Sequence, residues 1–481
     1  MRRHAWMAAT AILAAAVGCG DAGRGAPDAI PDLPVADTPS DTVGDAPSDT
    51  VGDAPSDTVG DAPSDTVGDA PGDAPRDAAD IPGEVPTPAS CRTPALANAS
   101  LPAGYCAWVF ATGLSTPRGL FVASNGDALV VERGEGRVTA LWDADGDGRS
   151  GDSERAVIAA ADGLNHGIAV SGAHLYASTS VTVYRWVYGA GERKDLGARE
   201  EVVRGIPGGG HSTRTLVFDA EGRMYVAVGS QSNLDPDASR AKIKRFPADR
   251  PAGGVDWDTG EDFAVGLRNE VGLAFDAAGR LWGVENGSDN LSRDDLGGDI
   301  HLGNPAEELN LFAEPGRFYG YPYCFTEMDL PAGVGGGPGT QWAYGHVMDD
   351  GTHTDAWCRD PANVVPPRFW MDAHTAPLGI VFYDGGLFPA DARGDAFVPL
   401  HGSWNDNPPT GYKVVRIRFQ GGEPATAEPI AVEPFLESAG PGDTGGGWAH
   451  RPVDAKVAAD GTLLVTSDAS DVVIAVGYGG L

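Results

Sequence analysis

One phrase recurs along residues 91–481 and limits the folds that this chain can adopt. It consists of an alternating apolar segment, a short turn that usually contains glycine, and a second alternating apolar segment, as in Val271-Gly-Leu-Ala-Phe followed by Gly279 and Leu281-Trp-Gly-Val. A period of two with such turns is typical of a β-hairpin. Six copies begin near residues 118, 166, 215, 271, 378 and 453.

The spacing of the copies predicts how they assemble. The first three spacings, 48, 49 and 56 residues, are each about the length of one four-stranded blade, and the later gaps of 107 and 75 residues leave room for inserted loops. The chain is therefore predicted to be all-β, with a six-bladed β-propeller of four-stranded antiparallel blades over 91–481. Turns in this part explain much of the excess of glycine (68) and proline (37) among the 481 residues.

The charge of the chain argues against two classes of partner. The sequence has 34 Lys+Arg and 68 Asp+Glu, for a formal net charge of −34. Nucleic-acid affinity comes largely from neutralised phosphates, so nucleic acid is not an expected partner. An anionic membrane surface is disfavoured for the same reason.

Residues 1–18 have the pattern of an export signal. Two arginines precede an apolar run from Met7 to Val17, which is too short to span a bilayer, and small residues lead to Cys19. This end resembles a bacterial lipoprotein signal, so we expect Cys19 to be lipidated. Gly20 favours an outer-membrane anchor, at the periplasmic face or the cell surface. The alternative is an ordinary secretory signal with an incidental cysteine.

Residues 19–90 are predicted to be a disordered spacer. The octapeptide Ser40-Asp-Thr-Val-Gly-Asp-Ala-Pro47 recurs identically at 48–55, 56–63 and 64–71. Because it has no aromatic residue, it cannot bury enough apolar surface to offset the entropy cost of ordering. Its acids and prolines extend the chain, as in a passive tether. A metal-binding acidic repeat is the alternative.

Four cysteines follow the spacer, and an even number in an exported chain suggests disulfides. Proximity in the sequence favours the pairs Cys91–Cys106 and Cys324–Cys358. The first would hold the start of the domain, and the second would clip a long insertion.

The residues that can carry chemistry stand at the ends of the repeated hairpins. The usual serine-hydrolase, zinc-protease and phosphate-loop motifs are absent. In a propeller the innermost strands begin near one mouth of the central channel, so residues at equivalent places converge there. Five stretches occupy such places: Gly208-Gly-Gly-His211, Gly266-Leu-Arg268-Asn269, Val284-Glu-Asn-Gly287-Ser288-Asp289, Leu400-His401-Gly-Ser-Trp404-Asn405 and Trp448-Ala-His450-Arg451.

Each of these groups suits one kind of work. Histidine can act as a base near neutral pH, and arginine with asparagine suits an anionic or quinone oxygen. A turn with glycine can direct carbonyl oxygens towards a hard cation. Taken singly, such residues are more commonly structural, and Trp404 and Trp448 are interpreted first as packing residues. Their joint occurrence at matching blade positions favours a functional site.

At these residues the chain resembles the soluble quinoprotein glucose dehydrogenases and their sorbosone dehydrogenase-like relatives. Gly-Gly-His211 before Leu-Val-Phe, Gly266-Leu-Arg-Asn-Glu-Val-Gly-Leu-Ala-Phe and Glu285-Asn-Gly carry the resemblance. Leu400-His-Gly-Ser-Trp-Asn405 followed by Gly411-Tyr-Lys-Val-Val-Arg416 is similar to the sorbosone and pyranose dehydrogenase branch. The resemblance covers about 115–478 and implies a six-bladed propeller that binds pyrroloquinoline quinone (PQQ) and calcium at the channel mouth.

The resemblance also implies roles for single residues. His211 matches the general base, while Arg268 and Asn269 match residues on the quinone oxygens. Arg451 matches an arginine that binds a carboxylate of PQQ, and His401 stands about where the glucose enzymes carry a cofactor-binding lysine. The metal positions are the carbonyls of Gly287 and Ser288, which match the ligands of the PQQ-bound calcium, and Glu308, which matches an acidic ligand of a second, structural calcium.

Three departures separate this chain from the glucose enzymes. Ser230 stands where those enzymes have an aspartate that orients the catalytic histidine, and Val271 replaces a glutamine near the cofactor. The cofactor-binding lysine is also lost. The first two weaken the reading of glucose as the substrate, and all three leave open how tightly PQQ binds.

A second calcium candidate lies apart from these motifs. Asp143, Asp145 and Asp147 with Glu154 fit the spacing D-x-D-x-D-G-x5-E of a calcium-binding loop. Ser150 replaces the usual apolar residue, and the flanks have strand patterns, so a helix-loop-helix hand is not expected. The two interpretations are a blade loop stiffened by calcium and a polar acidic turn.

Together these observations predict a PQQ- and calcium-dependent aldose or aldehyde dehydrogenase. Without a haem-attachment motif, its electrons would pass to an external acceptor such as a quinone or a cytochrome, and its membrane contact would be the lipid anchor alone. Two alternatives from other classes stay open: a lipid-anchored propeller that only binds carbohydrate or protein, and a calcium-dependent lactonase-type propeller.

Overall fold

The computed structural model describes residues 91–331, 333–344, 351–425, 432–440 and 448–479. The predictions for the signal (1–18), for Cys19 and for the spacer (19–90) lie outside these residues and stay predictions. In the described part of the chain, no helix has the length and apolar character needed to cross a membrane.

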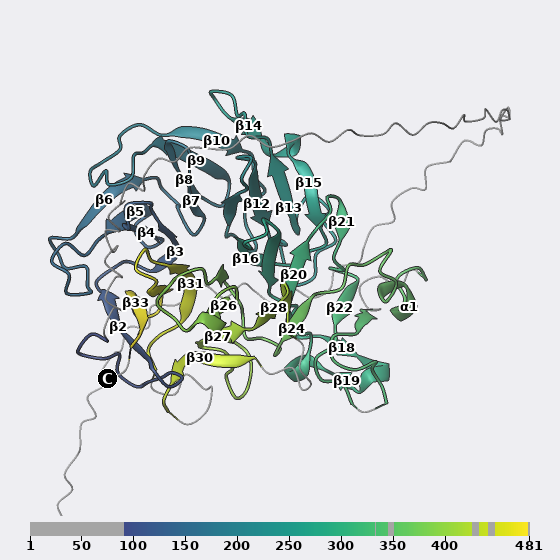
Figure 1. The fold of residues 1–481 in the computed structure, drawn as a ribbon. Coiled ribbons are helices and arrows are strands. Elements are labelled where there is room, and N and C mark those ends of the chain that lie inside the picture. The colour runs from purple at the N-terminus through teal and green to yellow at the C-terminus, as the bar shows by residue number, and fades with distance from the viewer. Residues whose placement is uncertain (1–90, 332, 345–350, 426–431, 441–447, 480–481) are drawn as a thin grey trace, which may run out of the picture. The chain divides into compact units, whose positions relative to one another are not determined.

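Six sheets are arranged in a ring, and each is one blade of a propeller (Figure 1). The first three blades contain the following strands in chain order: β3 (Pro117–Val122), β4 (Ala128–Glu132), β5 (Arg137–Leu141) and β6 (Arg155–Ala160); β7 (Ile168–Ser171), β8 (His174–Ser178), β9 (Thr182–Val187) and β10 (Glu200–Arg204); β11 (Leu216–Phe218), β12 (Met224–Val228), β13 (Lys242–Phe246) and β15 (Glu261–Val265). Two short parallel strands extend the second and third blades at the outside, β14 (Val255–Asp256) and β21 (Arg317–Phe318).

The last three blades follow the same plan. Their strands are β16 (Glu270–Phe275), β17 (Leu281–Glu285), β20 (Glu307–Phe312) and β24 (Phe369–Met371); β25 (Val381–Phe382), β26 (Ala396–Leu400), β27 (Lys413–Ile417) and β30 (Glu433–Ser438); β31 (Pro452–Val457), β32 (Leu463–Ser467), β33 (Val472–Tyr478) and β2 (Tyr105–Ala111). The short β1 (Ala99–Ser100) pairs with β30. The prediction of six blades built on the six repeated hairpins is confirmed.

The second strand of the repeated hairpin is buried along nearly its whole length in every blade. Every residue of β4, β12, β17, β26 and β32 is buried. These strands have neighbours on both edges of the sheet and another blade against each face, so apolar burial is continuous along them. The alternation expected of these second strands is therefore weak, and burial on both faces is the reason that they are nearly continuous apolar runs.

The ring is closed by a strand that precedes the first repeat. β2 pairs antiparallel with β33 in the last blade, from Tyr105↔Tyr478 to Ala111↔Val473. Because a closed ring leaves no open edge between its first and last blades, this pairing joins the two ends of the domain.

Both predicted disulfides are confirmed. Cys91 is bonded to Cys106, and Cys324 is bonded to Cys358. The first ties the segment before β1 to the closing strand β2. The second lies in the long insertion of the fourth blade, where it joins β22 (Cys324–Thr326) to α1 (Asp355–Cys358).

The predicted insertions are also present. The 107-residue gap contains β18 (Ser292–Arg293), β19 (Gly298–Asp299), β22 (Cys324–Thr326), β23 (Gln341–Ala343) and the single helical turn α1 (Asp355–Cys358). Figure 1 shows β18, β19, β22 and α1 beside the ring, at its lower right. The 75-residue gap contains the short hairpin of β28 (Phe419–Gln420) and β29 (Glu423–Pro424). Turns of 3-10 helix occupy Trp257–Thr259, Asp294–Leu296, His301–Gly303 and Ala390–Ala392.

The inner strands approach one another closely around the channel. A Cβ on Gly119 would overlap the carbonyl of His166, and one on Gly167 would overlap the carbonyl of Arg214. The backbone amide of Leu120 donates to Asp454 at 2.9 Å and closes the ring between the first and last blades. A cavity of about 380 Å³ lies in the channel and is lined by residues of all six inner strands.

The two tryptophans expected to pack behave differently. Trp448 is 5% exposed and belongs to the core, which confirms the expectation. Trp404 is 75% exposed, so the expectation that it packs is wrong. It lies in the loop between β26 and β27.

Candidate active site

Polar residues at the starts of the inner strands gather at one end of the channel, which we call the mouth. Hydrogen bonds connect them from blade to blade. Asn165 donates to the carbonyl of Ser212 at 2.8 Å, and Asn286 donates to the carbonyl of Pro377 at 2.6 Å. The guanidinium of Arg451 donates to the carbonyl of His401 at 3.0 Å. The convergence predicted from the repeats is therefore present.

Ser230 orients His211, which precedes the inner strand of the third blade. Its Nδ1 lies 3.0 Å from Ser230 Oγ and 3.1 Å from the Ser230 carbonyl oxygen. Ser230 Oγ donates its own proton to the carbonyl of Ser232 at 2.7 Å, so it accepts from the ring. Both contacts therefore place the ring proton on Nδ1 and leave the lone pair of Nε2 available as a base.

The surroundings keep this histidine neutral. Burial, followed by the charge of Arg268, lowers the pKa of His211 to about 4. In this chain a serine hydroxyl and a carbonyl take the place of a carboxylate at Nδ1. The tautomer is therefore fixed without the negative charge that would raise the pKa.

Gly229 brings His211 and Asn269 together. A Cβ at this position would lie 2.6 Å from His211 Cβ and 2.7 Å from Asn269 Oδ1. Two residues predicted to share the site, from the third and fourth blades, therefore meet across a position that has no side chain.

Arg268 is buried and its donors are already engaged by the protein. Its guanidinium donates to Asn233 Oδ1 at 2.9 Å and to Asp289 Oδ2 at 3.2 Å, and to the Asn286 carbonyl at 3.2 Å. Asp289 also faces His374 Nδ1 at 3.4 Å. The structure places Arg268 beside His211, as the sequence predicts, but its contact with a quinone oxygen stays a prediction.

On the other side of the mouth, Asp468 joins three blades. Arg118 Nη1 lies 2.7 Å from its Oδ2, and His401 Nε2 lies 2.8 Å from its Oδ1. Burial alone would raise the pKa of Asp468, but the hydrogen bond and charge of His401, with the charge of Arg118, lower it to about 2. Burial lowers the pKa of His401.

Sequence reasoning missed three members of this group: Arg118, His166 and Asp468. Arg118 and His166 open the first and second repeats, at the places where Arg268 and His211 drew attention in later repeats, so their position was the available signal. His166 is 3% exposed, and its Nδ1 has no hydrogen-bond partner among the described residues. Burial lowers the pKa of His166 well below its usual value.

The turn after β17 carries the predicted calcium carbonyls. The amide of Gly287 donates to Glu307 Oε2 at 2.6 Å, and Ser288 Oγ donates to the carbonyl of Asn233 at 3.2 Å. Over the described residues, neither the Gly287 nor the Ser288 carbonyl oxygen accepts a hydrogen bond. Both oxygens are thus available to a hard cation.

Glu308 lies in a cluster of three buried glutamates that the sequence did not predict. The amide nitrogen of Asn310 lies 3.5 Å from Glu270 Oε2, 3.4 Å from Glu285 Oε2 and 3.3 Å from Glu308 Oε2. Burial raises the pKa of Glu270 and of Glu285 well above the usual value, and the charges of neighbouring carboxylates add to the effect. Burial also raises the pKa of Glu308, to about 7. Asn310 Oδ1 and Glu270 Oε1 are buried without a partner among the described residues. Such a group holds protons or a cation.

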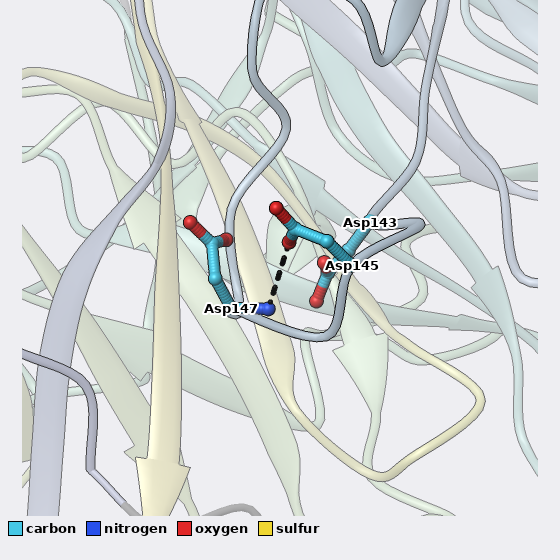
Figure 2. A group of neighbouring side chains, drawn as sticks. All are labelled: Asp143, Asp145 and Asp147. Atoms are coloured by element: carbon cyan, nitrogen blue, oxygen red, sulfur yellow. Dashed lines mark hydrogen bonds between the residues drawn. The ribbon is translucent and has the colours of Figure 1, made fainter.

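The acidic loop lies between β5 and β6, which confirms that its flanks are strands. Carboxylate oxygens of Asp143, Asp145 and Asp147 lie within 4.8 Å of one another, and all three residues are exposed (Figure 2). Glu154 instead accepts the amides of Ala144 and Gly151, at 2.7 and 2.8 Å. The structure thus brings together three of the four predicted ligands.

The fold and the mouth define a class of protein: a six-bladed propeller with a neutral buried histidine and several buried cationic or donor groups around one end of its channel. The sequence profile of the TrAA12-like family matches residues 99–478. This chain therefore belongs to the TrAA12-like family.

Known proteins agree with this assignment. The chain is similar to a pyrroloquinoline quinone-dependent pyranose dehydrogenase of Coprinopsis cinerea, with 34% identity over 388 residues that cover 74% of this chain and 52% of that protein. A pyrroloquinoline quinone-dependent sugar dehydrogenase of Hypocrea jecorina is 33% identical over 321 residues, or 61% of this chain and 71% of that protein. The chain thus spans about half the length of the Coprinopsis relative.

Solved structures match nearly end to end. The holo form of the pyranose dehydrogenase PQQ domain from Coprinopsis cinerea has a TM-score of 0.69 at 30% identity, covering 80% of this chain and 98% of that one. A calcium structure of a Trichoderma reesei enzyme of carbohydrate-active family AA12 has a TM-score of 0.71 at 29% identity, covering 79% and 97%.

Proposed function

We propose that this protein oxidises a sugar, with PQQ as the bound oxidant and calcium beside it. The observation that carries the proposal is the state of His211: neutral, held by Ser230 through Nδ1, and with no hydrogen bond to Nε2 from the described residues. Removing the hydroxyl proton of an aldose requires such a base next to an electron acceptor. The similarity to PQQ-dependent pyranose and sugar dehydrogenases supports the choice of acceptor.

The donor set at the mouth fits an anionic quinone. PQQ carries three carboxylates. The guanidinium Nε of Arg118 and the ring Nδ1 of His166 are both buried, and neither has a hydrogen-bond partner among the described residues. Arg451, whose guanidinium lies 5.0 Å from the centre of the Tyr412 ring, adds a third cationic or donor group. In place of the lysine of the glucose enzymes, His401 is bonded to Asp468, so carboxylate binding would fall mainly to the arginines.

The chain's own residues then supply the proton chemistry. His211 Nε2 accepts the proton of the sugar hydroxyl as the C–O bond becomes a carbonyl. Asn269 and Arg268 border the same space from the fourth blade and orient the reacting oxygen atoms. A bound PQQ would supply the two-electron oxidant for the sugar carbon, and a calcium ion beside it would supply Lewis-acid polarisation. The two electrons would then pass to an external acceptor, a quinone or a cytochrome.

We assign the calcium beside the cofactor to the Gly287 and Ser288 carbonyls, and a second calcium to the glutamate cluster that contains Glu308. The free carbonyl oxygens support the first assignment. The buried carboxylates around Asn310 support the second, because a divalent cation would neutralise charge that the protein otherwise holds only by protonation.

The test is reconstitution followed by kinetics. The purified protein is incubated with PQQ and calcium, and dye reduction is followed with a panel of aldoses. His211→Ala is expected to lower kcat by roughly 10²–10⁴, the usual contribution of a general base. His174→Ala is the matched control, because His174 begins β8 at the opposite end of its hairpin from the mouth. Sugar-independent lactone hydrolysis would support a lactonase instead, and sugar binding without dye reduction would support a binding module.

We also propose that Cys19 is lipidated and tethers the domain to the outer membrane through residues 19–90. Labelling of expressing cells with a palmitate analogue, compared between the natural chain and Cys19→Ser, tests the assignment. Label that persists in Cys19→Ser would contradict it.

The loop of Asp143, Asp145 and Asp147 remains predicted to bind calcium. The spacing of the acids and the convergence of three of them support it. A rise in Tm with calcium that Asp145→Asn reduces would confirm the site. An equal rise in both proteins would leave the loop a polar turn.

A further inference from the structure

The loop that carries His211 is held by two buried arginines. Arg240 donates to the carbonyls of Gly208 and Gly209, at 2.7 and 2.9 Å. Arg214 donates to the carbonyls of Pro207 and His211, both at 2.6 Å. Five of the loop's residues, 207–211, are thus spanned by guanidinium bonds, and two of its glycines have positive φ (Gly209 +76°, Gly210 +55°).

Neither arginine is paired directly with an acidic side chain among the described residues, although the charges of Asp235 and Asp237 partly oppose the lowering of the Arg240 pKa by burial. Arg214 is 0% exposed and Arg240 is 4% exposed. In the described part of the chain, neither guanidinium forms an ion pair, and the Nε of each lacks a hydrogen-bond partner. Burial, together with the charge of Arg240, lowers the pKa of Arg214 to about 9. A buried charge without a direct ion pair is costly, most of all for Arg214, so a purely structural clamp would be better made from neutral donors.

A third arginine of the same blade provides a comparison. Arg250 donates to the carbonyls of Gly222 and Pro247, at 3.1 and 2.6 Å, beside the turn between β11 and β12. That turn lies at the opposite end of the inner hairpin from His211. Arg250 therefore makes the same guanidinium–carbonyl hydrogen bonds at a turn that holds no residue of the proposed site.

We propose that Arg214 and Arg240 are positioning residues for His211, which fix the backbone of 207–211 so that Nε2 faces the mouth and add positive charge beneath the site. The proposal rests on the proposed function. The loop has no strand pairing of its own, and glycine at 208–210 gives it little intrinsic rigidity. The guanidinium bonds supply the rigidity that a base needs, since misplacement by about 1 Å can cost roughly 10² in rate.

The charge has a consequence of its own. The charged groups facing His211 are Arg268, Arg240 and Asp289, with Arg214 bonded to its carbonyl. The cations disfavour a second proton on the imidazole, and Asp289 favours it. Loss of Arg240 should therefore move the His211 titration to higher pH, whereas a lysine at this position should leave it nearly in place.

The experiment compares Arg240→Met, Arg240→Lys and the control Arg250→Met. In the protein without cofactor, the His211 ring is titrated by NMR, with its signal assigned by its loss in His211→Gln, and amide hydrogen exchange is followed over 207–211. We expect a higher titration midpoint only in Arg240→Met. We expect exchange at least roughly tenfold faster in Arg240→Met, as for loss of a hydrogen bond to a charged group, and less change in Arg240→Lys.

Both measurements are independent of dehydrogenase activity. In the reconstituted enzyme, Arg240→Met should lower kcat more than it raises KM, with partial rescue by Arg240→Lys. An unchanged midpoint and unchanged exchange in Arg240→Met would overturn the proposal, as would equal effects from Arg250→Met. If Arg240→Met does not fold, Arg240→Lys still tests the proposal. We expect it to show faster amide exchange over 207–211 and an unchanged titration midpoint of His211. Absence of activity in the natural chain, with the loop effects present, would reject the dehydrogenase and retain the role of the arginines.

Discussion

Gly229→Ala is expected to damage the site through one methyl group. Gly229 separates His211 from Asn269, and its backbone conformation is open to any residue, so the substitution adds no backbone strain. The added Cβ would lie 2.6 Å from His211 Cβ, 2.7 Å from Asn269 Oδ1 and 3.2 Å from the carbonyl of Arg268. The perturbation is therefore purely steric and local.

The size of the effect follows from those distances. Non-bonded carbon atoms rest about 3.5–4.0 Å apart, so His211 or Asn269 must move by about 1 Å. The Arg268 carbonyl prevents the backbone at residue 229 from shifting away. The side chains of His211 and Asn269 must therefore move instead. Overpacking of this kind costs roughly 1–3 kcal/mol of stability, and a base displaced by about 1 Å loses roughly 10² in rate.

The assay measures both quantities against a matched glycine. Gly386→Ala is the control, because an added Cβ there would have no atom of the described residues within 4 Å and the backbone is equally permissive. Denaturant unfolding gives the free energy of unfolding, and dye reduction with PQQ and calcium gives kcat/KM. Gly386→Ala should be neutral or slightly stabilising. Equal stability and equal kcat/KM in the two variants would refute the packing argument, and a stability loss without a rate loss would refute the placement of His211 at the reacting atoms.

Three further predictions follow from the mouth and the ring closure. In the reconstituted enzyme, kcat/KM should be level between pH 5 and 7 as far as His211 is concerned and fall as pH drops through about 4, where the imidazole gains its second proton; a pH–rate profile checks this. The pKa of Asp468 is held at about 2 in the folded protein, against 3.8 for a free aspartate, so its ionised form stabilises the fold by about 2 kcal/mol. This stabilisation should be present above pH 3.8 and disappear as pH falls through 2. In denaturant unfolding, Asp468→Asn should therefore lower the free energy of unfolding by at least that much at pH 7 but by little near pH 2. Replacing Cys91 and Cys106 by serine should cost about 3 kcal/mol for a loop of 15 residues, seen as a lower Tm, because the bond anchors the closing strand.

Much of the fold was predictable because its determinants are local. A hairpin is specified by side-chain alternation and by the residues of its turn, so six hairpins were recognisable one at a time. The disulfides Cys91–Cys106 and Cys324–Cys358 were predictable because their partners are only 15 and 34 residues apart. His211 and Arg268 were found because motifs near single strands point to them.

Other features depend on residues that are far apart in the sequence. Arg118 and Asp468 meet across a separation of 350 residues, and no local pattern indicates that pair. The same holds for the glutamates around Asn310, which come from three strands of one blade, and for the exposure of Trp404. Each depends on how a blade packs or where a loop is turned, and a local pattern carries no information about either.

The sequence by itself determined the unit of the architecture and the number of its copies, and it pointed to His211 as the candidate base, because periodicity, turn chemistry and short motifs act within a hairpin. The tertiary structure decided which groups face each other around the mouth. It decided that Ser230 fixes the tautomer of His211, that Asp468 joins Arg118 to His401, and that Arg214 and Arg240 hold the His211 loop. The physical reason is ring closure: only when β2 pairs with β33 and the six inner strands surround one channel do residues from different blades come within hydrogen-bonding distance.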